Sequence, residues 1–225
     1  MRRAALLCLL PILAAAPLAA QAFEGVVTLK MPTGGTRVGD AKYIIKGDKM
    51  VTVMTMGAGT GPMAGKEMRV ITDRTTMMGT MLIPMEMAGM KGIKVVVDLK
   101  ATAAKADRTG VITSLGTTES IAGYKCENMT ISDGKTTTTI CMSNQLGTFT
   151  FPSSGGMGGG SATPGWATAM ANHPGFPLRV TGSDGKVILE VTAVHPGRVS
   201  AEEFVIPEGY SSMPGMGGRR GGGGN

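Results

Sequence analysis

The sequence predicts a mainly β protein: a strongly curved antiparallel sheet or open (half) barrel with one or two short helices. Short runs of β-forming residues recur along most of the chain, and Gly- or Asp-containing turn signals separate them. Several runs are apolar at consecutive rather than alternate positions, so both faces of those strands are expected to be covered. Many short strands with regular turns are typical of sandwiches and barrels.

The N-terminus has the pattern of a secretory signal peptide. Two arginines precede an apolar run at residues 4–18, and the small residues Ala20 and Ala22 flank Gln21 at its end. The run is shorter than the roughly 20 apolar residues that a membrane span needs, although an uncleaved N-terminal anchor is an alternative. We therefore expect residues 1–22 to be removed and the mature chain to be periplasmic or secreted, without a transmembrane span.

The rest of the chain is expected to form a single β-rich domain at residues 23–212. Within this domain, the Gly-rich segment 153–163 is predicted to be a flexible loop. Residues 213–225, after the domain, are predicted to be a disordered Gly-rich tail. Strands are predicted at 23–31, 42–46, 49–56, 66–72, 75–83, 93–99, 111–119, 124–132, 135–143, 176–183 and 186–195. Two-residue turns between successive strands are predicted at Gly47-Asp48, Asp73-Arg74, Asp133-Gly134 and Asp184-Gly185.

Two segments are candidates for the short helices. Residues 164–171 begin with proline and place Trp166 and Met170 four positions apart, on one helical face. Residues 85–90 form a shorter, ambiguous run that contains a glycine. The sequence therefore predicts one helix from a clear signal and a second from a weak one.

Two cysteines remain after the predicted cleavage. If Asp133-Gly134 is a two-residue turn, Ser132 faces Lys135, and the same register places Cys126 directly opposite Cys141. Residues opposite each other in this way have Cα atoms about 5.5 Å apart, within disulfide range. In an exported protein such a pair is expected to form a disulfide; two free buried thiols are the alternative, and the spacing fits no common zinc pattern.

Methionine is unusually frequent between residues 50 and 90. In a strand, Met50, Met54 and Thr52 share one face while Val51 and Val53 take the other. Candidate ligand-binding residues on this basis are Met50, Met54, Met56, Met68, Met77, Met81, Met85 and Met87.

Three interpretations of these methionines compete. Methionine is adaptable and apolar, so it could simply fill the core. It is also the residue of adaptable apolar surfaces that accept lipids or other apolar ligands. Thioethers in addition prefer soft metals such as Cu(I), although the only two histidines, His173 and His195, lie far from the methionines in sequence.

No pattern of catalytic residues is present. The sequence contains no Gly-x-Ser-x-Gly, His-Glu-x-x-His or phosphate-binding loop motif. The mature chain carries a mild positive charge without a basic stripe interleaved with aromatic residues, which argues against nucleic-acid binding. We expect no enzyme, no cofactor and no metal site.

Taken together, three parts of the chain resemble one bacterial envelope family, catalogued as domain of unknown function 4412. The residues that carry the resemblance are 43–50 with 70–73, 120–128, and 176–180 with 204–210. The family has no agreed activity, so the resemblance implies no catalytic residue. Its layout is similar to that of the periplasmic lipoprotein-carrier half-barrels, in which a curved antiparallel sheet holds acyl chains against covering helices; this chain offers little helix for that purpose.

The sequence therefore favours a non-catalytic periplasmic binding or carrier domain for an apolar envelope ligand. The ligand would be a lipid or a lipoprotein acyl chain, bound on the methionine-lined face. The alternatives are a copper-handling protein that uses methionine thioethers, and a structural or interaction domain without a small ligand.

Overall fold

The computed structural model describes residues 22–34, 37–57, 63–87, 89–100, 110–132, 136–151, 164–170 and 173–212. The predicted signal peptide (apart from Ala22), the Gly-rich loop and the Gly-rich tail lie outside these ranges. Among the described residues, no helix is long and apolar enough to cross a membrane.

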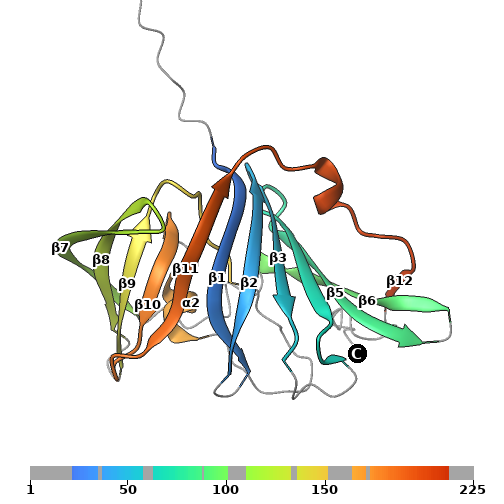
Figure 1. Ribbon diagram of the computed structural model, residues 1–225, viewed down its shortest axis with the longest axis horizontal. Coiled ribbons are helices and arrows are strands. Elements are labelled where there is room, and N and C mark those ends of the chain that lie inside the picture. Colours follow the sequence, from blue (N-terminus) through green and yellow to red (C-terminus); the bar gives the residue numbers. More distant parts are fainter. Residues whose placement is uncertain are drawn as a thin grey trace, which may run out of the picture.

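The described residues form one open sheet of 12 strands, which curves strongly and does not close (Figure 1). Its order is β12-β6-β5-β4-β3-β2-β1-β11-β10-β9-β8-β7. This confirms the predicted fold class. The strands are β1 (Glu24–Gly34), β2 (Arg37–Lys46), β3 (Lys49–Thr55), β4 (Glu67–Asp73), β5 (Met78–Met87), β6 (Met90–Asp98), β7 (Val111–Ile121), β8 (Tyr124–Ser132), β9 (Thr137–Ser143), β10 (Phe176–Thr181), β11 (Val187–Pro196) and β12 (Tyr210–Ser212), and the helices are α2 (Gly165–Ala169) and the 3-10 helix η3 (Ala201–Phe204).

The sheet consists of two antiparallel meanders that meet in its middle. Strands β1 to β6 form the first meander and β7 to β11 the second, and β1 pairs with β11 to join them (Figure 1). The one parallel pair in the described sheet joins β12 to β6, with Tyr210 beside Gly92. Residues 197–209 lead from β11, in the middle of the sheet, to β12 at the edge beside β6.

Two of the predicted turns show how local chemistry sets the connections. Lys46 pairs with Lys49 around Gly47-Asp48, and Gly47 has the positive φ (59°) that such a turn requires. The prediction of a two-residue turn at Asp73-Arg74 is wrong, because Asp73 pairs with Met78 and the turn covers residues 74–77. The Asp73 carboxylate accepts hydrogen bonds from the backbone N–H groups of residues 75 and 76 (2.9 and 3.2 Å), and these bonds stabilise the longer turn.

Of the two helix candidates, one is confirmed. Helix α2 lies within residues 164–171, and Trp166 and Met170 are both buried, as their spacing predicts. The weaker candidate is wrong: residues 85–87 end strand β5, and Met87 pairs with Met90 at the start of β6.

Strand β3 buries residues on both faces, at four consecutive positions. We call the face that carries Val27, Tyr43 and Met50 the inner face, because these side chains pack into the main hydrophobic core with Trp166 of α2. The opposite, outer face carries Val51, which is also fully buried. The predicted coverage of both faces is therefore observed in β3.

Residues 197–209, which we call the C-terminal strap, cross the outer face between β11 and β12 (Figure 1). The Lys46 ammonium donates to the Val199 carbonyl (2.7 Å), and the Glu24 carboxylate accepts from the Val199 N–H (2.7 Å) and pairs with Lys46 (3.3 Å). Further along, Arg69 of β4 forms an ion pair with Glu203 of η3. The strap therefore lies against β1 to β4.

The main core fills the inner face between β1–β2 and β8–β11. Phe149 lies at its centre, with ring centroids 5.3 Å from those of Tyr43 and Phe176 and 6.2–6.3 Å from those of Trp166 and Phe151. Aromatic pairs at such separations add about 0.5–1.5 kcal/mol each to the burial of their area. This half of the inner face is therefore occupied by the protein's own side chains.

Candidate functional site

The strand register brings the methionines of three strands onto the inner face. Met54 of β3 lies directly opposite Met68 of β4, and Met81 of β5 lies opposite Val70 of β4. Val70 in turn faces Thr52. Because Thr52 and Met54 lie two and four residues after Met50 along β3, all of these positions share a face with Met50. The alternation read from the sequence thus holds in the structure.

A second, smaller apolar cluster forms where these side chains meet. Val70, Met81 and Ile83 are buried at its centre, and partly buried Met54, Met63, Met68, Met85 and Val95 surround them. We call these eight residues the methionine cluster. Its outer members keep part of their side chains exposed to solvent, as do residues at the border of the main core such as Phe151.

The structure separates the predicted ligand-binding residues into groups. Met54, Met68, Met81 and Met85 belong to the methionine cluster, and Met54 packs against the main core as well. Met50 is 2% exposed and lies within the main core. Met56 follows β3 and is half-buried, and its backbone pairs with Lys66. Two predicted residues are elsewhere: Met77 lies in the turn before β5, where it is exposed, and Met87 lies in β5 opposite Met90, beyond a register irregularity.

Met63 is a cluster member that the sequence-based reasoning missed. It lies in the connection between β3 and β4, where strand periodicity gives no guidance. Hydrogen bonds from the N–H of Met56 to the Lys66 carbonyl and from the N–H of Lys66 to the Met63 carbonyl (2.9 and 3.1 Å) hold this connection together. They extend the hairpin past the strand ends and place Met63 against the cluster.

Charge is distributed unequally between the two faces of this region. At the paired positions of β3 to β6, and of β2 from residue 40 onward, the described charged side chains all lie on the outer face. They are Asp40, Lys42, Lys46, Lys49, Glu67, Arg69, Asp73, Lys94 and Asp98. The inner face at the same positions carries only apolar residues, glycine and two threonines. Because burying an unpaired charge is costly, this surface suits an apolar ligand and disfavours an ionic one.

Two buried hydroxyls interrupt the apolar inner face. Tyr43 of β2 lies opposite Thr52 of β3, both are at most 1% exposed, and neither side-chain oxygen has a hydrogen-bond partner beyond the other among the described residues. Burial raises the pKa of Tyr43, and the neighbouring Thr52 hydroxyl offsets only part of that rise, so the phenol stays neutral. A buried hydroxyl without a partner costs about 1–3 kcal/mol.

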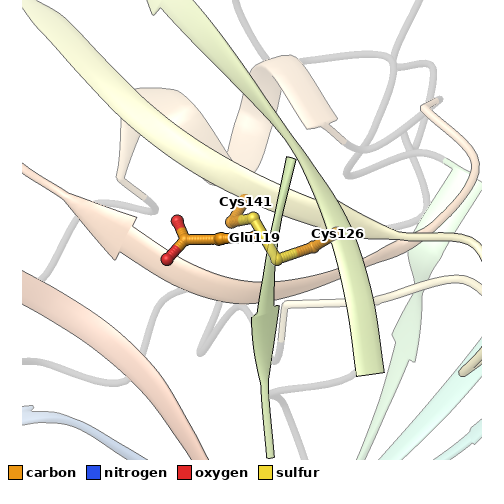
Figure 2. A group of neighbouring side chains, drawn as sticks. All are labelled: Glu119, Cys126 and Cys141. Atoms are coloured by element: carbon orange, nitrogen blue, oxygen red, sulfur yellow. A yellow bond between two sulfur atoms is a disulfide. The ribbon is translucent and has the colours of Figure 1, made fainter. Parts of the chain in front are cut away.

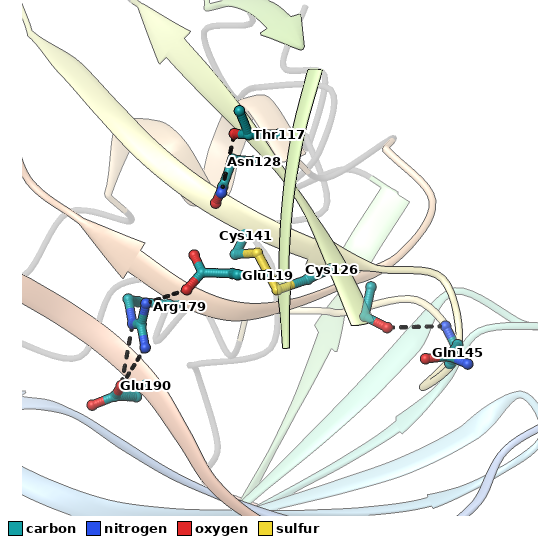
Figure 3. Close-up of a disulfide and its surroundings, with 9 residues drawn as sticks. Thr117, Glu119, Cys126, Asn128, Cys141, Gln145, Arg179 and Glu190 are labelled. Carbon is teal, nitrogen blue, oxygen red and sulfur yellow. Dashed lines mark hydrogen bonds and ion pairs between the residues drawn. A yellow bond between two sulfur atoms is a disulfide. The ribbon is translucent and has the colours of Figure 1, made fainter. Parts of the chain in front are cut away.

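The two cysteines are joined in a disulfide on the outer face of β8 and β9, with Cα atoms 5.3 Å apart (Figure 3). The predicted register is nevertheless wrong by two residues. Ser132 pairs with Thr137 instead of Lys135, and Asn128 instead of Cys126 lies opposite Cys141. A shift of two residues keeps every side chain on its face, which is why the cysteines can still reach each other diagonally.

Apolar pairing on the inner face explains the register. The observed pairing places Met129 opposite Ile140, and both are buried in the main core. A two-residue turn would instead have placed Met129 opposite Thr138. Burial of the apolar pair therefore decides the register, in preference to the local turn signal.

Glu119 lies beside the disulfide, so that one carboxylate oxygen and the two sulfur atoms are within 4.8 Å of one another (Figure 2). Such a group could hold a metal ion only if the sulfurs were thiolates, and here they are bonded to each other. The carboxylate is also engaged, because Arg179 donates to Glu119 (2.7 Å) and to Glu190 (3.0 and 3.2 Å) (Figure 3). We interpret this group as a structural connection between β7, β10 and β11.

Arg179 is well suited to that structural role. Burial works against its charge, but the hydrogen bonds and negative charges of Glu190 and Glu119 outweigh this and raise the pKa of Arg179. The guanidinium, which is charged at any physiological pH, thus joins side chains from β7 and β11 through β10.

Comparison with known proteins identifies the family. The sequence profile of a family described as a domain of unknown function (DUF4412) matches residues 23–210. The chain belongs to this family. The resemblance noted in the sequence is therefore confirmed, and the match covers strands β1 to β11 completely. No curated protein matches the chain significantly.

Among solved structures, the chain is similar to part of a protein named PNGF-II. A structure of PNGF-II in a P21 crystal form matches with a TM-score of 0.51 and 14% identity, over 85% of this chain and 31% of that one. A second PNGF-II structure, in a C2 form, matches with a TM-score of 0.49 and 15% identity, over 83% of this chain and 30% of the other. The chain spans about a third of PNGF-II, and at this identity the first likeness shows the fold alone.

Proposed function

We propose that this protein is a non-catalytic carrier or binding domain of the bacterial periplasm, and that it binds a lipid or a lipoprotein acyl chain on the methionine cluster. The observation that supports this most directly is the contrast along one inner face. The protein fills one half of that face with its own aromatic side chains, whereas the methionine cluster stays partly exposed and uncharged.

The chemistry of the cluster fits a flexible apolar ligand. Methionine side chains are unbranched and polarisable, so they adapt to ligands of varying shape. Each methylene group that leaves water contributes about 0.8 kcal/mol, so an acyl chain gains much from contact with such a surface. The absence of charged side chains at the paired inner-face positions described above means that no ion must be desolvated for this contact.

Two further features support an envelope location. The N-terminal sequence has the pattern of a signal peptide, and the Cys126–Cys141 disulfide suits an oxidising compartment.

The proposal is tested by native mass spectrometry of protein purified from an envelope fraction. We expect a co-purifying lipid in the wild type and its loss in Met54→Lys and Met68→Lys, which introduce a charge into the methionine cluster. Met78→Lys is the matched control, because Met78 faces outward and is 39% exposed. Lipid-free spectra of the wild type in repeated preparations would contradict the proposal, as would equal lipid loss in the control.

Copper handling is a second candidate, favoured by the direct opposition of Met54 and Met68 beside Met81 and Met85. Thioethers are soft ligands that prefer Cu(I). Under this hypothesis Cu(I) raises the melting temperature of the wild type. The double variant Met54→Leu/Met68→Leu removes that gain and Met78→Leu keeps it. If neither copper nor lipid has an effect, chemical crosslinking to a protein partner becomes the informative measurement.

A further inference from the structure

We propose that the methionine cluster is an oxidation site, and that reversible oxidation of its half-buried thioethers by hydrogen peroxide releases the apolar ligand. Each thioether sulfur takes one oxygen atom from the peroxide, which leaves a methionine sulfoxide and water. A thiol-dependent reductase reverses the step: two thiols become a disulfide, and the oxygen leaves as water. The inference rests on the proposed function for the ligand and adds a way in which binding at the same site is switched off.

The methionines of the sheet differ in how far a small oxidant can reach them. Four members of the methionine cluster are only partly buried, and they are Met54, Met63, Met68 and Met85. The buried methionines of the main core are at most 7% exposed, and they are Met31, Met50, Met129, Met142 and Met170. Oxidation follows exposure, so peroxide should modify the margin of the cluster and leave the core, and with it the fold, intact.

No free thiol among the described residues competes with these thioethers for the oxidant. Cys126 and Cys141 are bonded to each other, and the third cysteine of the sequence, Cys8, lies in the predicted signal peptide. Thiols ordinarily consume peroxide through their thiolates. In the described sheet the methionine thioethers are therefore the reduced sulfur atoms that remain for peroxide to attack.

Oxidation changes the property on which the proposed binding depends. A sulfoxide is polar and accepts hydrogen bonds, whereas the eight side chains of the methionine cluster, from valine, isoleucine and methionine, carry no donor. On the open surface the sulfoxide oxygen can accept a bond from water. An acyl chain that covers the cluster removes this water and leaves the oxygen unsatisfied, which is unfavourable. The sulfoxide and the bound ligand therefore oppose each other.

The strand register makes this opposition effective. Met54 and Met68 lie directly opposite each other on β3 and β4, a pairing that brings their Cβ atoms to about 4.5–5.5 Å. An oxygen added to either sulfur therefore enters a surface that both side chains share. Because coupling between two events at one site is reciprocal, a bound ligand should also protect these thioethers from oxidation.

The first test measures this protection. The mature wild-type chain is treated with hydrogen peroxide with and without 1-decanol, and oxidation of each methionine is followed by peptide mass spectrometry. At ten times the Kd of 1-decanol the free fraction is about one tenth, so Met54 and Met68 should oxidise about tenfold more slowly. Met77 and Met78, both 39% exposed and outside the methionine cluster, are the internal control and should oxidise at an unchanged rate. Equal slowing at all four positions, or at none, would overturn the inference.

The second test measures binding, and each protein is compared with itself before and after peroxide. Isothermal titration calorimetry should show that the wild type loses at least about tenfold in 1-decanol affinity, and that Met77→Leu/Met78→Leu loses as much. A cluster variant should keep whatever affinity it has before treatment, because leucine cannot form a sulfoxide; its substitutions are Met54→Leu, Met63→Leu, Met68→Leu and Met85→Leu. Methionine sulfoxide reductase with dithiothreitol should restore the wild type, and unoxidised protein treated in the same way controls for the disulfide.

The outcomes separate this inference from the proposed function. If the untreated wild type does not bind 1-decanol, the proposed function fails and this inference fails with it. If the untreated protein binds and keeps the same affinity once Met54 and Met68 are sulfoxides, only this inference is overturned. It is also overturned if peroxide oxidises the main-core methionines before those of the cluster, or if circular dichroism shows that the oxidised protein has unfolded.

Discussion

The two halves of the inner face use the same sheet for different purposes. Between β1–β2 and β8–β11, rigid aromatic rings around Phe149 fill the space with specific ring-to-ring contacts. Across β3 to β5, methionines with many rotamers surround a small buried centre of three residues. Rigid, shape-specific packing stabilises a fold, whereas adaptable packing leaves a surface that a ligand can complete. The difference suggests that stability and binding are separated along one sheet.

Replacing the central aromatic residue should have the largest effect. Phe149→Ala is expected to lower the free energy of unfolding by about 3–5 kcal/mol, the usual cost of removing a buried phenylalanine. Met68→Ala, in the methionine cluster, should cost only about 1 kcal/mol because its side chain is partly exposed already. Urea unfolding followed by circular dichroism measures both. Equal losses would show that the two halves contribute alike to stability.

The disulfide should stabilise the second meander without affecting the methionine cluster. The variant Cys126→Ala/Cys141→Ala is expected to be less stable by about 3 kcal/mol, through the chain entropy that the disulfide removes from the unfolded state. A phosphine reductant should lower the melting temperature of the wild type toward that of the variant and leave the variant unchanged. Loss of the co-purifying lipid in this variant, with the protein still folded, would break the separation of roles.

The junction of β12 with β6 should be sensitive to a single methyl group. A Cβ at Gly92 would lie 2.2 Å from the Ile83 carbonyl oxygen and 2.6 Å from Cε1 of Tyr210. Gly92→Ala should therefore cost about 1–3 kcal/mol by overpacking. Gly197→Ala, where a Cβ would meet no atom within 4 Å, is the control. A neutral result for Gly92→Ala in thermal unfolding would show that β12 is not firmly held.

The smallest expected effect concerns the strap and pH. The Val199 N–H, followed by Lys46, holds the pKa of Glu24 below its usual value of 4.5. A carboxyl with a lowered pKa in the folded state adds stability above its unfolded pKa and loses it as the pH falls through the folded one. Glu24→Gln should thus melt slightly below the wild type at pH 7, and the two should converge as the pH falls through the lowered pKa of Glu24. A constant difference across this range would contradict the assignment.

The sequence predicted which face each side chain takes more reliably than what covers that face. Alternation along β3 placed Met50, Thr52 and Met54 together, because side-chain direction in a strand has a fixed period. The same pattern could not show that Met50 would be buried within the main core while Met54 would lie between that core and the other methionines. That distinction depends on Phe149, which follows β9 in an irregular segment without a periodic signal.

The sequence also identified the disulfide partners but not their register. A shift of two residues in the pairing of two strands changes which residues lie opposite each other, but every side chain stays on the same face of the sheet. The parallel strand β12 and the strap could not be anticipated either, because three residues are too few for a strand pattern. The contacts of Val199 and Glu203 with strands more than 130 residues earlier depend on the tertiary fold alone.

The position of β1 in the middle of the sheet has a consequence for how the chain folds. One edge of β1 pairs with β2, its neighbour in sequence, but the other edge pairs with β11, more than 150 residues later. The chain is synthesised from its N-terminus, so the first meander can form early. The backbone N–H and C=O groups along the other edge of β1 have no strand to pair with until β11 has been synthesised. Such long-range pairing slows folding. The open edge is an aggregation risk during that interval, so the seam between the two meanders is where a chaperone would protect the nascent molecule most.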